Sequence, residues 1–253
     1  MYYKNISYTI SHIFVVLFMY LFIAPRYSKP KTAAICTAMF FAITAPNVLK
    51  LNLFPNSRLC YLIVTVYQIV MTQMTGLIIS IKRDSKALFV GLSASNYVIA
   101  GSIMATIIYI YTGNLFLCTA GCILTHIVLM FLLYVKLREI WVQIQKKETM
   151  NSWWKLCLIP VFFFFGFSCL AFFPYTLDDY PTNIPGVVMF IIVMFVSYVI
   201  VLQYVSSESQ RTEIYWQNVL FESYIKSLEN QYYLVEQSEK NLRILQHDMR
   251  HYS

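Results

Sequence analysis

The chain has 253 residues, of which 58% are hydrophobic and only 12% are charged, and its mean hydropathy is +0.59. Such values lie far outside the range of soluble globular proteins. The composition therefore excludes a soluble domain as the whole chain, and the formal net charge of +7 has to be explained by where the basic residues stand.

Seven windows of the sequence contain no Asp, Glu, Lys or Arg. Each is roughly 18 to 25 residues long, which at about 1.5 Å per residue lets a helix cross a hydrocarbon core of about 30 Å. Because helices satisfy their own backbone hydrogen bonds in lipid, we expect an all-α fold with seven transmembrane helices in a sensor domain over residues 1–205. Pro46 is expected to kink the second helix. The windows are Ile6–Ala24, Thr32–Leu49, Leu59–Ile81, Ala87–Tyr111, Leu115–Val135, Leu156–Pro174 and Gly186–Val205.

The basic residues between the windows predict the orientation in the membrane. With the amino terminus outside, the inner loops hold 11 Lys and Arg residues and the outer segments hold 3. The positive-inside rule then predicts a multi-pass cell-membrane protein with its amino terminus outside and its carboxyl terminus in the cytoplasm. The net charge thus reflects topology beside anionic headgroups and not a nucleic-acid partner. The first window is expected to be retained and not cleaved as a signal peptide, because three basic residues follow it.

Few polar side chains interrupt the windows, and those singled out are His12, Gln68, Gln73, Asn96 and His126. All six cysteines fall inside them, which implies no disulfide framework. Cys118 and Cys122 share a helix face, where packing as small apolar residues is far commoner than a metal pair. His126 is expected to hydrogen-bond between helices and not to relay protons. A small-molecule transporter is the alternative from another class, but ion-coupled carriers usually keep charged residues in their spans.

Residues 206–253 form a second region that is rich in charge and contains no Gly or Pro, which favours one continuous cytoplasmic helix. Apolar residues recur in it every seven positions, and the d positions of the same heptads are mostly polar. This pattern predicts a coiled-coil stalk that pairs two copies of the chain through a weak seam. With Leu242 at position a, His247 falls at the outward position f and Asp248 at g. The a row is Ile214, Phe221, Leu228, Val235, Leu242 and Met249, and the d row is Gln217, Tyr224, Gln231, Ser238 and Leu245.

The adjacent His247 and Asp248 carry the chemistry that the sequence suggests. An imidazole with a pKa near 6.5 is largely neutral at physiological pH, so one ring nitrogen has a lone pair that can attack phosphorus. The carboxylate beside it can accept a hydrogen bond from the other ring nitrogen and stabilise the imidazolium that forms. Arg250 could help to hold an incoming phosphate. Phosphoryl transfer needs little beyond such an in-line nucleophile and neutralised charge.

The stretch Leu242–His251 resembles the phosphoacceptor box of membrane sensor histidine kinases of the accessory-gene-regulator and GHKL-ATPase type found in Gram-positive bacteria. Their box reads roughly His-Asp-x-(Arg/Lys)-(His/Asn) and follows a charged helix like Glu239–Arg243 here. The resemblance implies that His247 is phosphorylated and that Asp248 is its adjacent acid. His251 stands where many members have Asn, which makes it a second, less favoured acceptor. The similarity at the level of motifs covers only the last 15 to 50 residues or so.

The resemblance also implies ATP and Mg²⁺, but only for a following kinase domain that the 253 residues do not include. The chain itself is expected to bind no cofactor and no metal, and we expect it to be a truncated product, a fragment or the input half of a split protein. The function expected is the sensory half of a two-component kinase, with a cognate response regulator as partner and an extracellular peptide or envelope ligand at the loop Tyr175–Pro185. The alternative is a non-catalytic membrane receptor or regulator that dimerises with full-length kinases.

Overall fold

The computed structural model describes the backbone of residues 2–54, 57–146, 153–172 and 176–251, and the side chains of residues 6–54, 57, 59–146, 153–172 and 176–244. Within these ranges every regular element is a helix, apart from one isolated β-bridge between Pro25 and Ser80. The expected all-α fold is therefore confirmed for the described chain.

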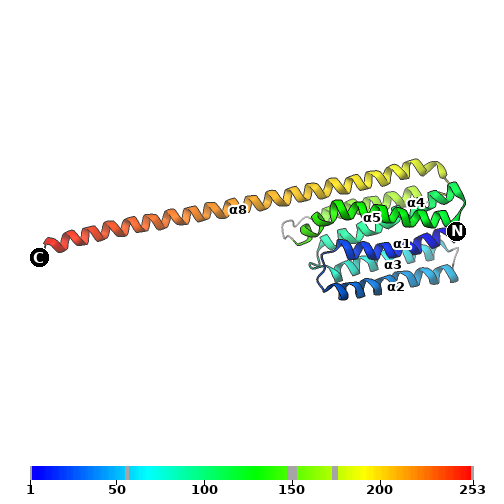
Figure 1. Ribbon diagram of the computed structural model, residues 1–253, viewed down its shortest axis with the longest axis horizontal. Helices are drawn as coiled ribbons and strands as arrows, with labels where there is room; N and C mark the ends of the chain where they lie inside the picture. Colours follow the sequence, from blue (N-terminus) through cyan, green and yellow to red (C-terminus); the bar gives the residue numbers. More distant parts are fainter. Residues whose placement is uncertain (1, 55–56, 147–152, 173–175, 252–253) are drawn as a thin grey trace. The chain divides into compact units, whose positions relative to one another are not determined.

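Five long helices are followed by a divided span and a final long helix (Figure 1). Among the described residues, six helical segments are long and apolar enough to cross a membrane. The apolar part of the first helix, Ile6–Phe22, is shorter, so the number of seven spans stays a prediction. These lengths indicate a membrane protein. The elements are α1 (Tyr2–Phe22), α2 (Lys29–Leu53), α3 (Arg58–Ile79), α4 (Ser85–Thr112), α5 (Leu115–Lys146), α6 (Trp153–Leu156), α7 (Leu158–Phe167), the π-helical η1 (Ser168–Phe172), the 3₁₀ helix η2 (Pro181–Asn183) and α8 (Ile184–His251).

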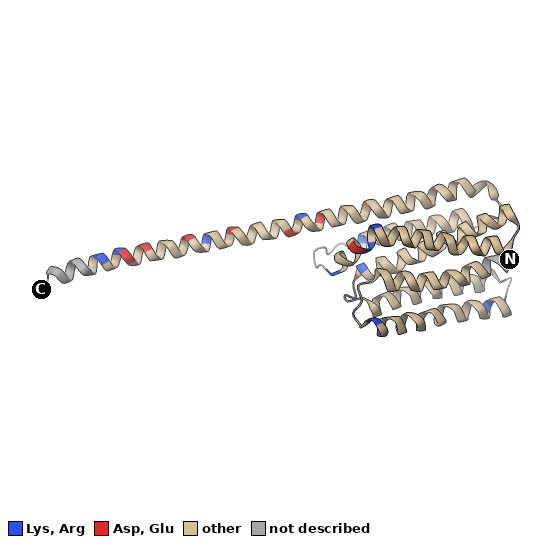
Figure 2. Ribbon diagram, in the orientation of Figure 1, with Lys and Arg blue, Asp and Glu red and all other residues tan. Residues whose placement is uncertain are grey.

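Residue contacts divide the chain into two units, Met1–Ser206 and Ser207–Ser253. The first unit is a helical bundle that includes the beginning of α8, and the second unit consists of the rest of α8. Figure 2 shows how differently charge is distributed in the two units. Lys and Arg in the bundle gather towards one end of it, whereas residues of both signs are scattered along the second unit.

Helix α4 is the centre of the bundle, and it packs against α1, α3, α5 and α7. Its sequence explains this position, because small residues such as Ala94, Ala100 and Ala105 let neighbouring backbones approach. These three side chains are fully buried, and so is the ring of Phe89. Helix α1 packs against α2, α4 and α5, so the first helix of the chain is also an inner one.

Local sequence sets several helix ends. The Asp84 carboxylate accepts a hydrogen bond from the backbone N–H of Lys86 (3.0 Å) and so caps α4 at its start. Gly113 ends the same helix with φ +62°, a left-handed conformation that glycine adopts at little cost. One residue later, the Asn114 side chain accepts a hydrogen bond from the N–H of Phe116 at the start of α5 (2.8 Å). Pro46 lies inside α2, which continues through it to Leu53.

The end of α1 is tied to α3 and α5. The backbone N–H of Arg26 donates to the carbonyl of Ile79 (2.8 Å), and the N–H of Ile81 donates to the carbonyl of Ala24 (3.0 Å). The buried Gln145 side chain of α5 accepts from the N–H of Ala24 (2.9 Å) and donates to the carbonyl of Phe22 (2.7 Å). One amide thus satisfies two backbone groups that the end of a helix leaves without partners.

Candidate functional site

The residues singled out by sequence, His247 and Asp248, are consecutive residues of α8. Their side chains lie outside the described residues, as do those of Met249, Arg250 and His251. The structure therefore gives their helical backbone and no geometry for the imidazole and the carboxylate. The loop predicted to meet an outside ligand is described only from residue 176 onward.

The apolar row predicted for the stalk is exposed in a single chain. Ile214, Phe221, Leu228, Val235 and Leu242 are each between 45% and 63% exposed. A row of large apolar side chains at seven-residue spacing is costly in water unless another surface covers it. The exposure fits the requirement of a coiled coil for a partner helix, and Met249 at the end of the row lies outside the described side chains.

In the described part of the loop before α8, the side chain of Asp179 stabilises a turn. Its carboxylate accepts hydrogen bonds from the backbone N–H (3.1 Å) and the hydroxyl (2.9 Å) of Thr176. Leu177 is buried at 2% exposure and anchors the loop on the bundle. Asp179, one of two adjacent aspartates in this loop, therefore has a structural role.

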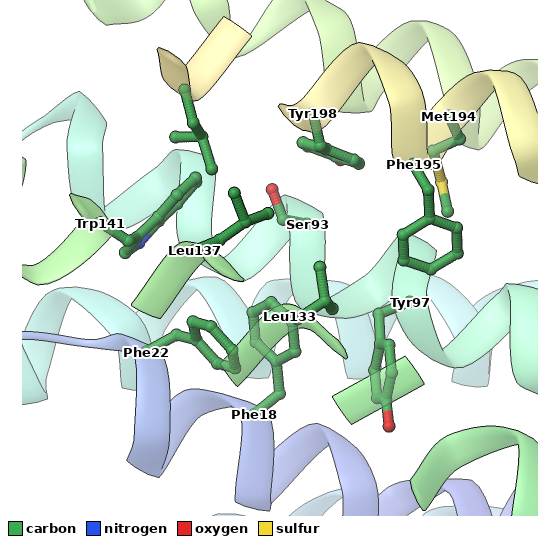
Figure 3. Close-up of a pocket in the computed structure, with 11 residues that line it drawn as sticks. Phe18, Phe22, Ser93, Tyr97, Leu133, Leu137, Trp141, Met194, Phe195 and Tyr198 are labelled. Atoms are coloured by element: carbon green, nitrogen blue, oxygen red, sulfur yellow. The ribbon is translucent and has the colours of Figure 1, made fainter. Parts of the chain in front are cut away.

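A small cavity lies beneath the first part of α8 (Figure 3). It is lined almost entirely by rings and aliphatic side chains from α1, α4, α5 and α8. Its one side-chain hydroxyl other than those of tyrosine belongs to Ser93, which donates to the carbonyl of Phe89 (2.7 Å). A cavity of this chemistry stays dry or takes an apolar group. The lining residues are Phe18, Phe22, Ser93, Tyr97, Leu133, Leu137, Trp141, Met194, Phe195, Tyr198 and Leu202.

Aromatic contacts and one amide hold α8 against the bundle around this cavity. The Phe89 ring stacks on Trp141 (4.9 Å between centroids) and meets the edge of Tyr198 (5.9 Å). The Asn96 amide nitrogen donates to the carbonyl of Pro160 (2.7 Å) and to the hydroxyl oxygen of Tyr198 (3.3 Å). The amide therefore links α4, α7 and α8. Its own oxygen has no hydrogen-bond partner among the described atoms.

Two hydrogen-bonded groups flank α1, and both are built from neutral side chains. On one side the His12 ring contacts the hydroxyl of Thr44 (3.2 Å) and the amide nitrogen of Gln68 (3.2 Å). Gln68 also accepts from the hydroxyl of Tyr8 (2.7 Å) and donates to the carbonyl of Ile43 (3.0 Å). That carbonyl lies in α2 three residues before Pro46, so the Gln68 amide adds a hydrogen bond between α3 and α2.

On the other side of α1, the fully buried His126 of α5 contacts the hydroxyl of Ser11 (2.9 Å). Its ring stacks on Phe14 (4.5 Å between centroids), and the Tyr97 hydroxyl donates to the His126 carbonyl (2.7 Å). His126 is therefore the interhelical hydrogen bonder that the sequence favours. Its Nδ1 has no hydrogen-bond partner among the described atoms.

Sequence reasoning missed most partners in these groups. It singled out His12, His126 and Gln68, but not Tyr8 or Ser11. A signal was present, because Ser7, Tyr8, Ser11 and His12 recur at helical spacing along α1 and mark a polar stripe in an apolar helix. Within the described residues, no group of three or more His, Cys, Asp or Glu side chains could hold a metal ion. The Cys118 and Cys122 thiols are free and buried.

No protein-family model, curated protein or solved structure matches this chain. The function proposed below therefore rests on the stretch Leu242–His251 and on the organisation of the helices.

Proposed function

We propose that the chain is the sensory half of a two-component histidine kinase, with seven spans in the cell membrane, the amino terminus outside and the carboxyl terminus in the cytoplasm. In this proposal the bundle responds to an envelope signal or peptide, and α8 relays the response to His247. The observation that carries the proposal is the extent of α8. One helical element, Ile184–His251, begins inside the bundle and includes the His-Asp pair.

The packing around α8 supports a relay. Met194, Tyr198 and Leu202 face α1, α4 and α5 across a small cavity (Figure 3), so α8 meets these helices here through side chains around a void. A helix that is packed through long side chains over a void is easier to displace than one packed backbone to backbone. A signal that shifts the bundle would thus act on the element that carries His247.

At His247, the proposed step is phosphoryl transfer to one ring nitrogen. The imidazole attacks the terminal phosphorus of ATP held by a kinase domain, the bond from that phosphorus to ADP breaks, and the ring nitrogen gains a phosphoryl group. Asp248 accepts a hydrogen bond from the other ring nitrogen and stabilises the positive charge that develops. A response regulator then takes the phosphoryl group.

Phosphate labelling of the full chain tests the proposal. Membranes containing the chain are incubated with radiolabelled ATP and a GHKL-type catalytic domain supplied as a separate protein. We expect acid-labile, alkali-stable label on the chain. Replacing His247 with Gln should remove more than about 90% of it, because the attacking nitrogen is lost.

The matched control is His251→Gln, which changes a second histidine of the same helix turn and should keep the label. Equal labelling of the His247→Gln chain would refute the acceptor. Label that disappears only with His251→Gln would move the acceptor to that residue.

A further inference from the structure

We propose that the exposed face of α8 inside the bundle unit binds the same face of a second copy of this chain within the membrane. This face, termed here the α8 seam, consists of Met189, Val193, Val196, Ile200 and Gln203. The proposal rests on the proposed function, because it extends the pairing of two stalks into the spans.

The burial pattern divides the first part of α8 into two opposite faces. At about 100° per residue, the five seam residues fall within about 40° of one line along the helix. The four apolar ones are between 48% and 60% exposed, and Gln203 is exposed as well. The residues on the opposite line, Val187, Ile191, Met194, Tyr198 and Leu202, are buried in the bundle. The side of this helix opposite to the bundle therefore exposes a stripe of four apolar residues and Gln203.

The heptads of the stalk continue into this stripe. Counting back by sevens from Ile214 at position a gives Ser207, Ile200 and Val193. The d row continues from Gln217 through Gln210 to the last three seam residues, which are Gln203, Val196 and Met189. The a and d rows predicted to pair two stalks thus coincide, without a change of register, with the face that the bundle leaves exposed.

Charges in the stalk follow the same division. Seven charged residues lie between positions 222 and 243, and six of them occupy heptad positions b or f. In the bundle unit, positions b and f are among those buried against other helices. Positions b and f therefore hold residues that pack on the bundle in the first unit and mostly charged residues in this part of the stalk. The positions of the α8 seam hold the apolar a row of the stalk and its mostly polar d row. The six are Glu222, Lys226, Glu229, Glu236, Lys240 and Arg243.

Gln203 adds a polar side chain to the α8 seam near the end of the last span. It lies in the charge-free window Gly186–Val205, and it is exposed. A side-chain amide turned towards lipid without a partner is unfavourable. Across a two-fold axis, each of two Gln203 amides offers a donor and an acceptor to the other. Polar side chains of this kind hold membrane helices together through hydrogen bonds between helices.

Disulfide crosslinking of the full chain in its own membranes tests the α8 seam. Cys169, which is exposed, is replaced by Ser, and single cysteines are introduced by Val193→Cys, Val196→Cys or Ile200→Cys. After copper–phenanthroline oxidation, we expect strong disulfide dimers at all three positions, because a disulfide needs Cα atoms about 4.4–6.8 Å apart. The matched control is Ile192→Cys, which is as exposed as position 193 but lies off the seam. It should crosslink several-fold less, and so should Phe131→Cys on α5.

A stalk variant, Leu228→Cys, separates the possible outcomes. Strong crosslinking at 228 together with yields at 193, 196 and 200 no higher than at 192 and 131 would overturn the α8 seam. Such a result would mean that the stalks pair while lipid covers the spans. No crosslinking at any position, 228 included, would overturn the pairing of both regions. Labelling of His247 is measured separately, so failure of the proposed phosphoacceptor is distinguishable from failure of the seam.

Discussion

At the scale of single residues, the bundle depends on side chains that fill positions glycine leaves open. The His126 ring occupies the space beside Gly101 on α4, where an added Cβ would collide with the ring. The same ring lies on Phe14 and contacts the Ser11 hydroxyl. One histidine therefore joins α1, α4 and α5, and its fit requires the absence of a side chain at position 101.

Gly101→Ala should consequently destabilise the bundle. The methyl group would force the His126 ring out of its position, and overpacking of this kind costs about 1–3 kcal/mol. Thermal unfolding of the purified chain in detergent would register the loss as a lower Tm.

The matched test is a double-mutant cycle with His126→Ala. Once the ring is removed, its collision with the added methyl group disappears, so Gly101→Ala should cost far less stability in the His126→Ala background. Two effects that simply add would contradict the steric explanation.

At the scale of elements, α8 is held by its buried stripe over the aromatic cavity. Met194 is 1% exposed and lines that cavity. Met194→Ala should enlarge the cavity and cost about 2–5 kcal/mol, since the surrounding rings relax only in part. Thermal unfolding of the purified chain in detergent would show this loss of stability as a lower Tm. The control is Phe131→Ala, which truncates a side chain of α5 that is 64% exposed and should shift stability far less. Equal losses of stability in both variants would mean that a side chain at the cavity contributes no more to stability than an exposed one.

The windows without charge predicted where helices cross a membrane but not where they end. Helix α5 continues to Lys146, well beyond the predicted limit at Val135, because its last turns bury Trp141, Ile144 and Gln145 against the rest of the bundle. Absence of charge reports compatibility with lipid, whereas a helix ends where its backbone loses partners.

The sixth window is also divided in a way that its composition does not reveal. Its described part runs from Leu156, the last residue of α6, through α7 and the π-helical η1. Pro160 has no backbone N–H to donate to the carbonyl of Leu156, which accounts for the break between α6 and α7. Its own carbonyl accepts from Asn96.

The candidate site was predictable only where its residues are neighbours in the sequence. The pair His247 and Asp248 could be recognised because the two residues are adjacent in the sequence. Ser11 and His126 are 115 positions apart, and Tyr8 and Gln68 are 60 apart. Which polar side chains of different spans meet is decided by helix packing, and periodicity gives only the face on which each one lies.

At the scale of the whole molecule, the proposed orientation predicts which turns meet the outside. A cysteine at Thr112, in the turn between α4 and α5, should react with a membrane-impermeant maleimide on intact cells. A cysteine at Lys29, at the start of α2, should react only after the cells are permeabilised, because the positive-inside rule places that loop in the cytoplasm.

The chain without these substitutions sets the background from the native cysteines. If the Lys29→Cys chain is labelled on intact cells and the Thr112→Cys chain is not, the orientation is the opposite of the proposed one.

The hydrogen bonds between Gln145 and the end of α1 have a consequence for the order in which the molecule is made. Ala24 and Gln145 are 121 positions apart, and at about 5–20 residues per second a ribosome needs about 6 to 24 s to pass from one to the other. During that interval α1 has been synthesised without the partner that closes its end, and His126 has not yet reached Ser11. The innermost helices cannot be completed in chain order, so the first span has to wait in the membrane or its insertion machinery until the fifth arrives.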